Sequence, residues 1–309
     1  MVERTTSDEG IPELAAPGRP GPNLSTGSPR LRQGVPADGG GHPGGSWRPA
    51  TANLAWEQRR YERWGGDHVA RYRWARAALR DARVLDVGCG FGFGARLLLG
   101  AFREYVGVDL DRPAIEWART VLAPEVPQAT FLDTARLPTE RAFDAVTCFE
   151  VVEHVDDPGQ LLRDLRAAAL PGARVFLSTP NGTLSAGRPE WFMSPYHVAE
   201  FTAKEFAAIV RAEFSDPGEF FVQRRVDRLD CAPQVLRLQL TPGLTGRQAG
   251  AGRAATSTPA PLRRGHAALR RIPSPASLWR IERLPTPICD GRWYSHLLWA
   301  GRSTDPPRR

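Results

Sequence analysis

Short apolar runs alternate with segments of helical periodicity through the middle of the chain. Five runs have the length and composition of buried strands: RVLDVG (83–88), YVGVDL (105–110), ATFLD (129–133), FDAVTCF (143–149) and ARVFLSTP (173–180). Between them, apolar residues three and four positions apart predict helices over 92–101, 113–122 and 158–170. Near-continuous apolar strands that alternate with helices are typical of a parallel sheet covered on both faces. The pattern therefore predicts an α/β protein.

Further elements flank this alternating region. Apolar and aromatic residues between 56 and 79 recur with a helical period, which predicts helix there. A second helix is expected over 202–214, because Thr202 and the glutamate three residues later form a capping box. Alternating or apolar residues predict two more strands, over 219–225 and 294–302.

Composition divides the chain into four parts. Residues 1–50 are rich in Pro, Gly, Ser and Arg without a hydrophobic period, so we expect a disordered leader. Residues 51–230 carry the alternating elements and form the main domain. A Pro/Gly/Arg-rich insertion follows over 231–290, where long regular elements are not expected apart from a short helix near 263–271. Residues 291–309 supply the final strand and a tail.

The net charge of +7 is unevenly distributed. Residues 231–309 contain 13 arginines and three acidic residues, whereas the first 230 residues contain 28 basic and 31 acidic ones. The main domain is therefore not basic, and nucleic acid is not the expected partner. The four cysteines show no CxxC spacing, and no apolar run reaches the 18 or so residues that a membrane span needs. We expect a cytoplasmic protein without a membrane span.

A glycine-rich turn, LDVGCGFGFG (85–94), lies between the first strand and a helix. Glycines such as Gly88 and Gly90 let the backbone bend sharply and let a ligand approach it, while the following helix presents N–H groups. Gly90, with Gly92 and Ala95, also fits the dinucleotide fingerprint, so a nicotinamide-dependent oxidoreductase is one alternative.

Aspartates lie at the carboxyl ends of three successive strands. Asp86 precedes the glycines, and Asp109 and Asp133 close the second and third strands. Ligands of open α/β sheets bind at this edge, although an aspartate there can also simply cap a helix or a turn. A carboxylate at Asp86 would repel a pyrophosphate and attract an ammonium group. S-adenosylmethionine carries an ammonium and a sulfonium and no phosphate, so the acids favour it over NAD.

Five motifs together resemble those of class I S-adenosylmethionine-dependent methyltransferases. They are RVLDVGCGFG, VGVDLD, FLDTARLP, FDAVTCFEVVEHVDDP and LPGARVFLSTPN. The resemblance covers residues 60–225 and 294–302, and the motifs are similar to those of the ubiquinone-pathway O-methyltransferase-like, or type 11, group of bacteria. It implies a Rossmann-like, seven-stranded, mostly parallel sheet with helices on both faces, in which six strands are parallel and one is antiparallel.

The resemblance also assigns residues to the cofactor. By analogy, Asp86, Gly88 and Gly90 would hold the methionine end, and Arg71 would bind the cofactor carboxylate. Asp109 would bind the ribose, and Asp133 and Thr134 would bind the adenine. Phe149 would pack against the cofactor. About 65 residues separate the sixth strand from the seventh, where the family usually has a tight connection. The acceptor is therefore not inherited from the resemblance.

The segment FEVVEHV (149–155) offers acid, base or metal chemistry. If it begins a helix, Glu150, Glu153 and His154 share one face, and His197 from the loop after the fifth strand supplies a fourth ligand for Mg²⁺, Mn²⁺ or Zn²⁺. This pattern is similar to that of metal-dependent ubiquinone-pathway and small-RNA methyltransferases. Alternatively, no metal binds, Glu153 shapes the pocket, and His154 or His197 removes a proton from the acceptor.

The expected activity is methyl transfer from S-adenosylmethionine to a hydroxyl group of a small molecule, such as a sugar, a phenol or a secondary metabolite. The motif ExxEH followed by a later histidine, with the basic 231–309 segment, supports an RNA-terminal 2′-O-methyltransferase as an alternative. The glycine turn would also suit a nicotinamide-dependent oxidoreductase or a non-catalytic cofactor-binding subunit.

Overall fold

The computed structural model describes residues 49–138, 142–184, 197–225, 275–284 and 295–304. Most of the expected leader, most of the expected insertion and the helix expected near 263–271 lie outside these ranges. Within them, no helix combines the length and apolarity that would be needed to cross a bilayer.

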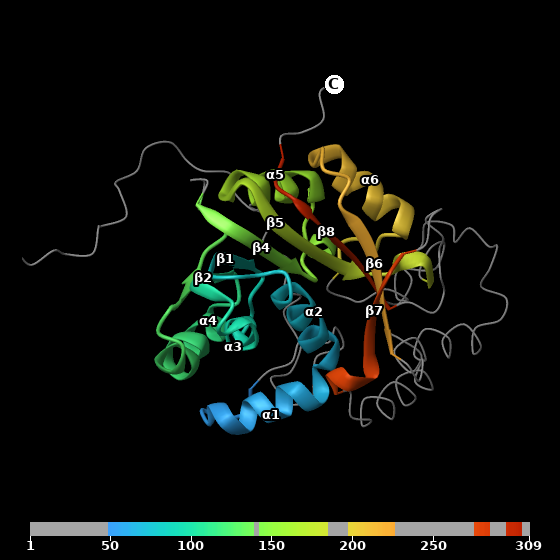
Figure 1. The fold of residues 1–309 in the computed structure, drawn as a ribbon. Helices are drawn as coiled ribbons and strands as arrows, with labels where there is room; N and C mark the ends of the chain where they lie inside the picture. Colours follow the sequence, from blue (N-terminus) through green and yellow to red (C-terminus); the bar gives the residue numbers. More distant parts are fainter. Residues whose placement is uncertain (1–48, 139–141, 185–196, 226–274, 285–294, 305–309) are drawn as a thin grey trace, which may run out of the picture.

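An eight-stranded sheet forms the centre of the molecule, with the strand order β3-β2-β1-β4-β5-β8-β6-β7 (Figure 1). The strands are β1 (Ala82–Val87), β2 (Phe102–Asp109), β3 (Ala129–Asp133), β4 (Phe143–Phe149), β5 (Ala169–Pro180), β6 (Glu219–Arg225), β7 (Trp279–Arg283) and β8 (His296–Arg302). The first five are parallel, β8 is antiparallel to both β5 and β6, and β7 is antiparallel to β6. Six strands thus share one direction, as predicted.

The sequence predicts seven strands, and the sheet contains eight. Strand β7 lies in the segment that the sequence assigns to an irregular insertion, and it pairs with β6 over Phe221–Arg225. Only five residues long, it gains its stability from this pairing and not from a local pattern that would predict it. The α/β, Rossmann-like, mostly parallel architecture itself is confirmed.

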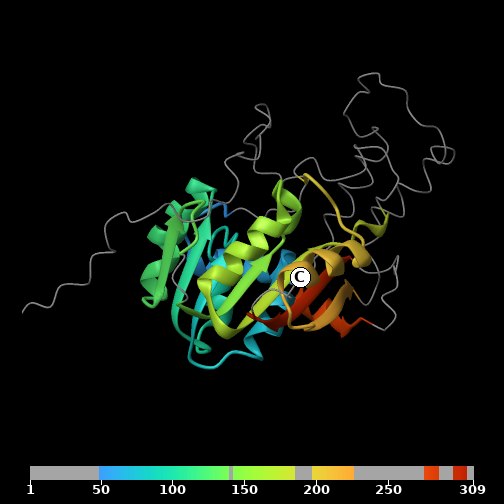
Figure 2. The ribbon, with the colours of Figure 1, turned by 90° about the horizontal axis from the view of Figure 1, so that it is seen from above.

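Two groups of helices cover the two faces of the sheet (Figures 1 and 2). The helices are α1 (Leu54–Trp64), α2 (Gly66–Arg76), α3 (Phe93–Leu98), α4 (Arg112–Trp117), α5 (Pro158–Ala168) and α6 (Ala203–Glu213). One apolar core joins α5 and α6 to the sheet, and the other joins α2, α3 and α4 to the opposite face. Strands buried from both sides explain why their sequences are continuously apolar.

The helix starts follow their sequence signals. Thr202 caps α6, and Glu205 completes the predicted capping box. Asn53, Asp111 and Asp157 each accept a hydrogen bond from a backbone N–H in the first turn of α1, α4 and α5. These caps fix where α4 and α5 leave the sheet, and therefore which residues lie at the carboxyl ends of the strands.

Candidate active site

The parallel register gathers the predicted acidic residues at one edge of the sheet. Asp109 and Asp133 are direct neighbours across β2 and β3. Asp86, on β1, is level with Gly107 of β2 and with Thr147 of β4. The edge that the sequence assigns to the ligand is thus formed by β1, β2, β3 and β4 together.

The turn after β1 is shaped by glycines in the left-handed region. Gly88, Gly90 and Gly92 have φ angles of 74°, 53° and 75°. The backbone N–H of Gly90 donates to Asp109 Oδ2 at 2.7 Å. A Cβ placed on Gly90 would meet nothing within 4 Å, whereas one on Gly88 would lie 2.3 Å from a carbon of Val151. The open side of the turn is therefore at Gly90, where a ligand can approach the backbone.

Asp109 keeps hydrogen-bonding capacity beside this open side. Its Oδ1 accepts from the backbone of Asp111 at 2.8 Å, and its Oδ2 accepts from Gly90. The backbone of Leu110 is a further donor, and an ionised carboxylate has about four lone-pair sites, so Asp109 can still accept a hydrogen bond from a ligand. Asp133 is partly exposed, 3.9 Å from Arg112 Nε, and Thr134 follows it. This arrangement fits the two hydroxyls of a ribose and an adenine amino group.

Asp86 lies beneath the turn and not on its open side. The carboxylate is fully buried and accepts hydrogen bonds from the hydroxyls of Tyr72 (2.8 Å), Thr147 (2.6 Å) and Tyr105. Burial raises the pKa of Asp86 to about 6, although the three hydroxyls act in the opposite direction. The expectation of an open carboxylate facing the ligand is not met. A role for Asp86 in cofactor binding, acting through the turn, stays a prediction.

Arg71 and Phe149 lie behind the same edge. Arg71 is fully buried on α2 and donates to Gln223 Oε1 at 2.9 Å and to Asp67 Oδ2 at 3.2 Å. Its Nε has no hydrogen-bond partner among the described residues, and an orphaned buried donor suits an anionic group such as the cofactor carboxylate. Phe149 is buried, with its ring edge-on to Tyr72 at 5.2 Å. The residues present fit S-adenosylmethionine.

The exit of β4 departs from the predicted geometry. Glu150 has a φ of 60°, and a short 3₁₀ helix over Val152–His154 replaces the expected α-helix. The Glu150 carboxylate accepts from Ser178 Oγ at 2.7 Å and lies 3.2 Å from His296 Nε2. Burial alone would raise the pKa of Glu150, but the His296 ring and the Arg71 guanidinium stabilise its carboxylate and hold the pKa well below its ordinary value. The expectation that Glu150 shares a face with Glu153 and His154 is therefore wrong.

Three of the four predicted metal ligands do come together. Ligand atoms of Glu153, His154 and His197 lie within 4.8 Å of one another. The two imidazole rings are 5.0 Å apart and edge-to-face. Burial and the Glu150 charge raise the pKa of Glu153 well above its ordinary value. The backbone N–H of Val198 donates to the Glu153 carbonyl at 2.8 Å, which ties the His197 loop to the 3₁₀ helix.

Five residues that the sequence analysis did not single out complete the site. They are Tyr72, Tyr105 and Thr147 around Asp86, Glu200 beside His197, and His296 beside Glu150. Glu200 Oε1 lies 2.8 Å from His197 Nδ1, and the spacing of three residues was a signal for this pair. The others come from distant segments, so no local spacing reveals them.

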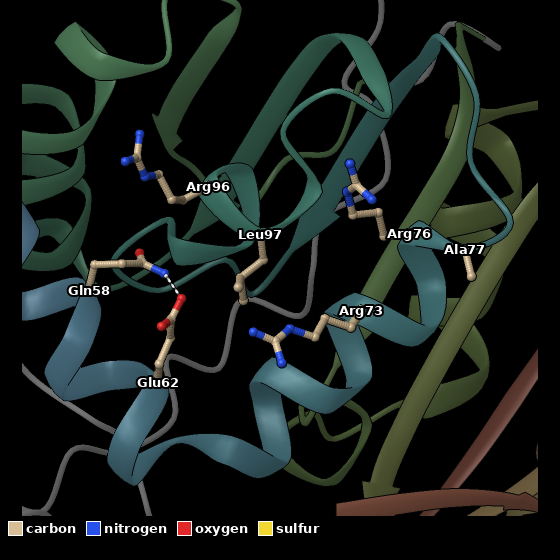
Figure 3. A pocket seen from close by; sticks show the side chains of 7 residues that line it. All are labelled: Gln58, Glu62, Arg73, Arg76, Ala77, Arg96 and Leu97. Atoms are coloured by element: carbon tan, nitrogen blue, oxygen red, sulfur yellow. Dashed lines mark hydrogen bonds between the residues drawn. The ribbon is translucent and has the colours of Figure 1, made fainter. Parts of the chain in front are cut away.

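A separate surface pocket lies away from these groups (Figure 3). Its volume is about 540 Å³. The lining residues are Gln58 and Glu62 of α1, Arg73 and Arg76 of α2, Ala77 directly after α2, and Arg96 and Leu97 of α3. It contains none of the predicted site residues. The chemistry at the strand ends, and not this pocket, therefore defines the candidate active site.

Comparison with known proteins identifies the family of this chain. A family model described as a methyltransferase domain matches residues 56–213, about half of the chain. The chain belongs to the methyltransferase domain family. Its matched region contains the glycine turn, the three aspartates and the β4 exit, so the family predicted from the motifs is confirmed.

Individual relatives match over part of their length. The chain is 36% identical over 124 residues to a ubiquinone biosynthesis O-methyltransferase of Xanthomonas campestris pv. campestris, which covers 39% of this chain and 50% of the relative. A "probable S-adenosylmethionine-dependent methyltransferase" of Mycolicibacterium smegmatis is 34% identical over 137 residues, or 44% of this chain and 51% of the relative. The chain thus spans about half the length of the curated relatives that it matches.

A solved structure is also similar to the chain. The YcgJ protein of Bacillus subtilis has a TM-score of 0.47 and 18% sequence identity, with 77% of this chain and 99% of that chain covered.

Proposed function

We propose that this protein transfers a methyl group from S-adenosylmethionine to a hydroxyl group of a small molecule. The observation that carries the proposal is the cluster of Glu153, His154 and His197 at the strand edge that also holds the glycine turn and Asp109. The cofactor supplies an electrophilic methyl group on a positively charged sulfur. The protein then has to align the acceptor, exclude water and remove the acceptor proton.

His197 is the group that we assign to proton removal. Glu200 Oε1 lies 2.8 Å from His197 Nδ1, and the side chains of both residues are nearly buried. A carboxylate at Nδ1 fixes the tautomer in which Nδ1 carries the proton and Nε2 carries the lone pair. In this tautomer, Nε2 can take a proton from a hydroxyl acceptor. His154, edge-on to His197, helps to hold that ring in place.

A divalent cation is the second candidate role for this cluster. Two imidazoles and one carboxylate are suitable donors for Zn²⁺ or Mn²⁺, and a carboxylate with added water suits Mg²⁺. Glu150, the remaining ligand predicted from the sequence, instead faces Arg71 and His296. The loss of this ligand favours the base over the metal, and chelation separates the two.

The test of this proposal is an acceptor screen on the full chain. Purified protein and S-adenosylmethionine are incubated with phenols, sugars and nucleotide sugars, a set of amines and a short RNA, and methylated products are identified by mass spectrometry. O-methylation of a phenol or sugar that falls at least about a hundredfold in His197→Ala supports the proposal. Methylation of amines alone would refute it, and methylation of the RNA terminus would favour the RNA alternative.

A further inference from the structure

Tyr72 connects helix α2 to the interior of the cofactor turn. Its hydroxyl donates to Asp86 Oδ2 at 2.8 Å, and both side chains are buried. The other two donors to Asp86, Tyr105 and Thr147, stand on β2 and β4, neighbours of β1 in the sheet. Tyr72 thus links a separate helix to this carboxylate, whereas the other two come from the sheet itself.

The ring of Tyr72 also fills the space beneath the turn. A Cβ on Gly94, in the first turn of α3, would lie 2.6 Å from Asp86 Oδ2 and 2.6 Å from a ring carbon of Tyr72. The same ring meets Phe149 edge-on at 5.2 Å. The turn connects β1, which carries Asp86, to α3. Because the Asp86–Tyr72 pair also contacts Gly94 of α3, it lies against both elements that the turn joins.

We propose that Tyr72 is a positioning residue for cofactor binding, whose hydroxyl orients the Asp86 carboxylate and so couples the docking of α2 to the shape of the glycine turn. Asp86 stands two residues before Gly88. A shift of its carboxylate would therefore move the start of the glycine turn, and with it the position of the Gly90 backbone. Without the Tyr72 hydroxyl, one buried lone pair of a charged group loses its donor. A hydrogen bond to a charged group changes an equilibrium by about tenfold or more.

Titration of Asp86 gives a readout that simple loss of packing would not change. The titratable groups that face Asp86 are Tyr61, Tyr72, Cys89, Tyr105, Asp109 and Cys148. The Tyr72 hydroxyl favours the ionised form of Asp86 and so lowers its pKa, which burial has raised to about 6. A positively charged cofactor favours the ionised form, so its affinity should fall as the pH falls through this range. In Tyr72→Phe, the fall should begin at higher pH.

The experiment measures cofactor affinity directly, without turnover. S-adenosylmethionine is titrated into the full chain by calorimetry between pH 5 and pH 8, for wild type, Tyr72→Phe, Asp86→Asn and the double variant. Tyr61→Phe is the matched control, because it removes a buried tyrosine hydroxyl that faces Asp86 from helix α1, whereas the side-chain hydroxyls that donate to Asp86 are those of Tyr72, Tyr105 and Thr147. Circular dichroism and thermal unfolding report on folding.

We expect Tyr72→Phe to raise the Kd about tenfold at pH 7 and to shift the pH midpoint of binding upward, with little change in Tyr61→Phe. In the Asp86→Asn background, the same substitution should change the Kd less than about twofold. In the double variant, residue 86 carries no charge that needs the Tyr72 hydroxyl. Its comparison with Asp86→Asn therefore remains possible if Tyr72→Phe alone does not fold. An unchanged Kd in Tyr72→Phe, an unmoved midpoint, or an equal loss in the Asp86→Asn background would each overturn the proposal.

Discussion

Adding one methyl group at Gly90 should separate cofactor binding from folding. Gly90 has a φ of 53°, and a Cβ there would meet nothing within 4 Å. Gly90→Ala therefore creates no steric clash within the protein. Its cost in folding is that of an alanine in the left-handed region, about 1–2 kcal/mol. For a domain of this size, that lowers the midpoint of thermal unfolding by about 2–8 °C.

Binding should change far more than folding does. The open side of the turn is the place where the cofactor has to approach the backbone, and Asp109 accepts the Gly90 N–H at 2.7 Å beside it. A Cβ in that space displaces the ligand and weakens the contact with the backbone. We expect the Kd for S-adenosylmethionine to rise by at least about tenfold, or about 1.4 kcal/mol.

Gly172 provides a matched control within the same chain. Its φ is 78°, and a Cβ there would also meet nothing within 4 Å. It lies on β5 before the segment that pairs with β4 from Arg174 onward, at the opposite end from the site. Gly172→Ala should therefore lose a similar amount of stability but bind the cofactor like wild type. Calorimetry with S-adenosylmethionine and thermal unfolding make both measurements. Equal Kd values for Gly90→Ala and Gly172→Ala would refute the placement of the cofactor.

Three further predictions concern the charged groups of the site. Because the folded pKa of Asp86 is about 6 and the ordinary pKa of an aspartate is 3.8, its ionisation opposes folding: the stability that its protonated form contributes is present below pH 4 and is lost as the pH rises through 6. The free energy of unfolding of apo Asp86→Asn, measured in urea, should therefore gain about 2 kcal/mol on wild type between pH 4 and pH 7, and a difference independent of pH would contradict this. Glu200→Gln should lower kcat about tenfold with the cofactor Kd unchanged, because the neutral amide holds the His197 tautomer less strongly. The control is Glu104→Gln, on β2 near the end opposite to Asp109. Equal rates for the two variants would count against the role of Glu200. Exhaustive chelation should leave the rate of O-methylation unchanged, whereas a loss that Mg²⁺, Mn²⁺ or Zn²⁺ restores would assign the Glu153 cluster to a metal.

The sequence predicted the fold because the relevant signals are local. Apolar runs separated by helical periods define β1 to β5, and the capping box at Thr202 marks the start of α6. Strand β7 was missed because its five residues, WRIER, carry no alternation that distinguishes them from the Arg-rich segment around them. Its pairing with β6 spans more than 50 residues of chain, and a pairing of that range leaves no local pattern.

The site was predicted in part, for a similar reason. Spacing along strands and turns placed Gly90, Asp109 and Asp133 at one edge, since parallel strands end together. Spacing along an expected helix failed for Glu150, because a left-handed φ and a 3₁₀ turn replaced the α-helix. The direction of that side chain is decided by His296, which is far away in the sequence.

The strand-end carboxylates differ in function because they differ in which groups reach them. Asp109 receives backbone N–H donors from Gly90, Asp111 and Leu110 and keeps hydrogen-bonding capacity at an open turn, so it can still bind a ligand. Asp86 receives three side-chain hydroxyls from three elements and is closed off, so we expect it to act on a ligand without direct contact, through its charge and through the backbone that it braces. We therefore expect the same residue type, near the ends of neighbouring strands, to contact the ligand in one case and to support the turn in the other. Mutations should reflect this difference: loss of Asp109 would remove contacts with the cofactor, whereas loss of Asp86 would deform the turn that presents them.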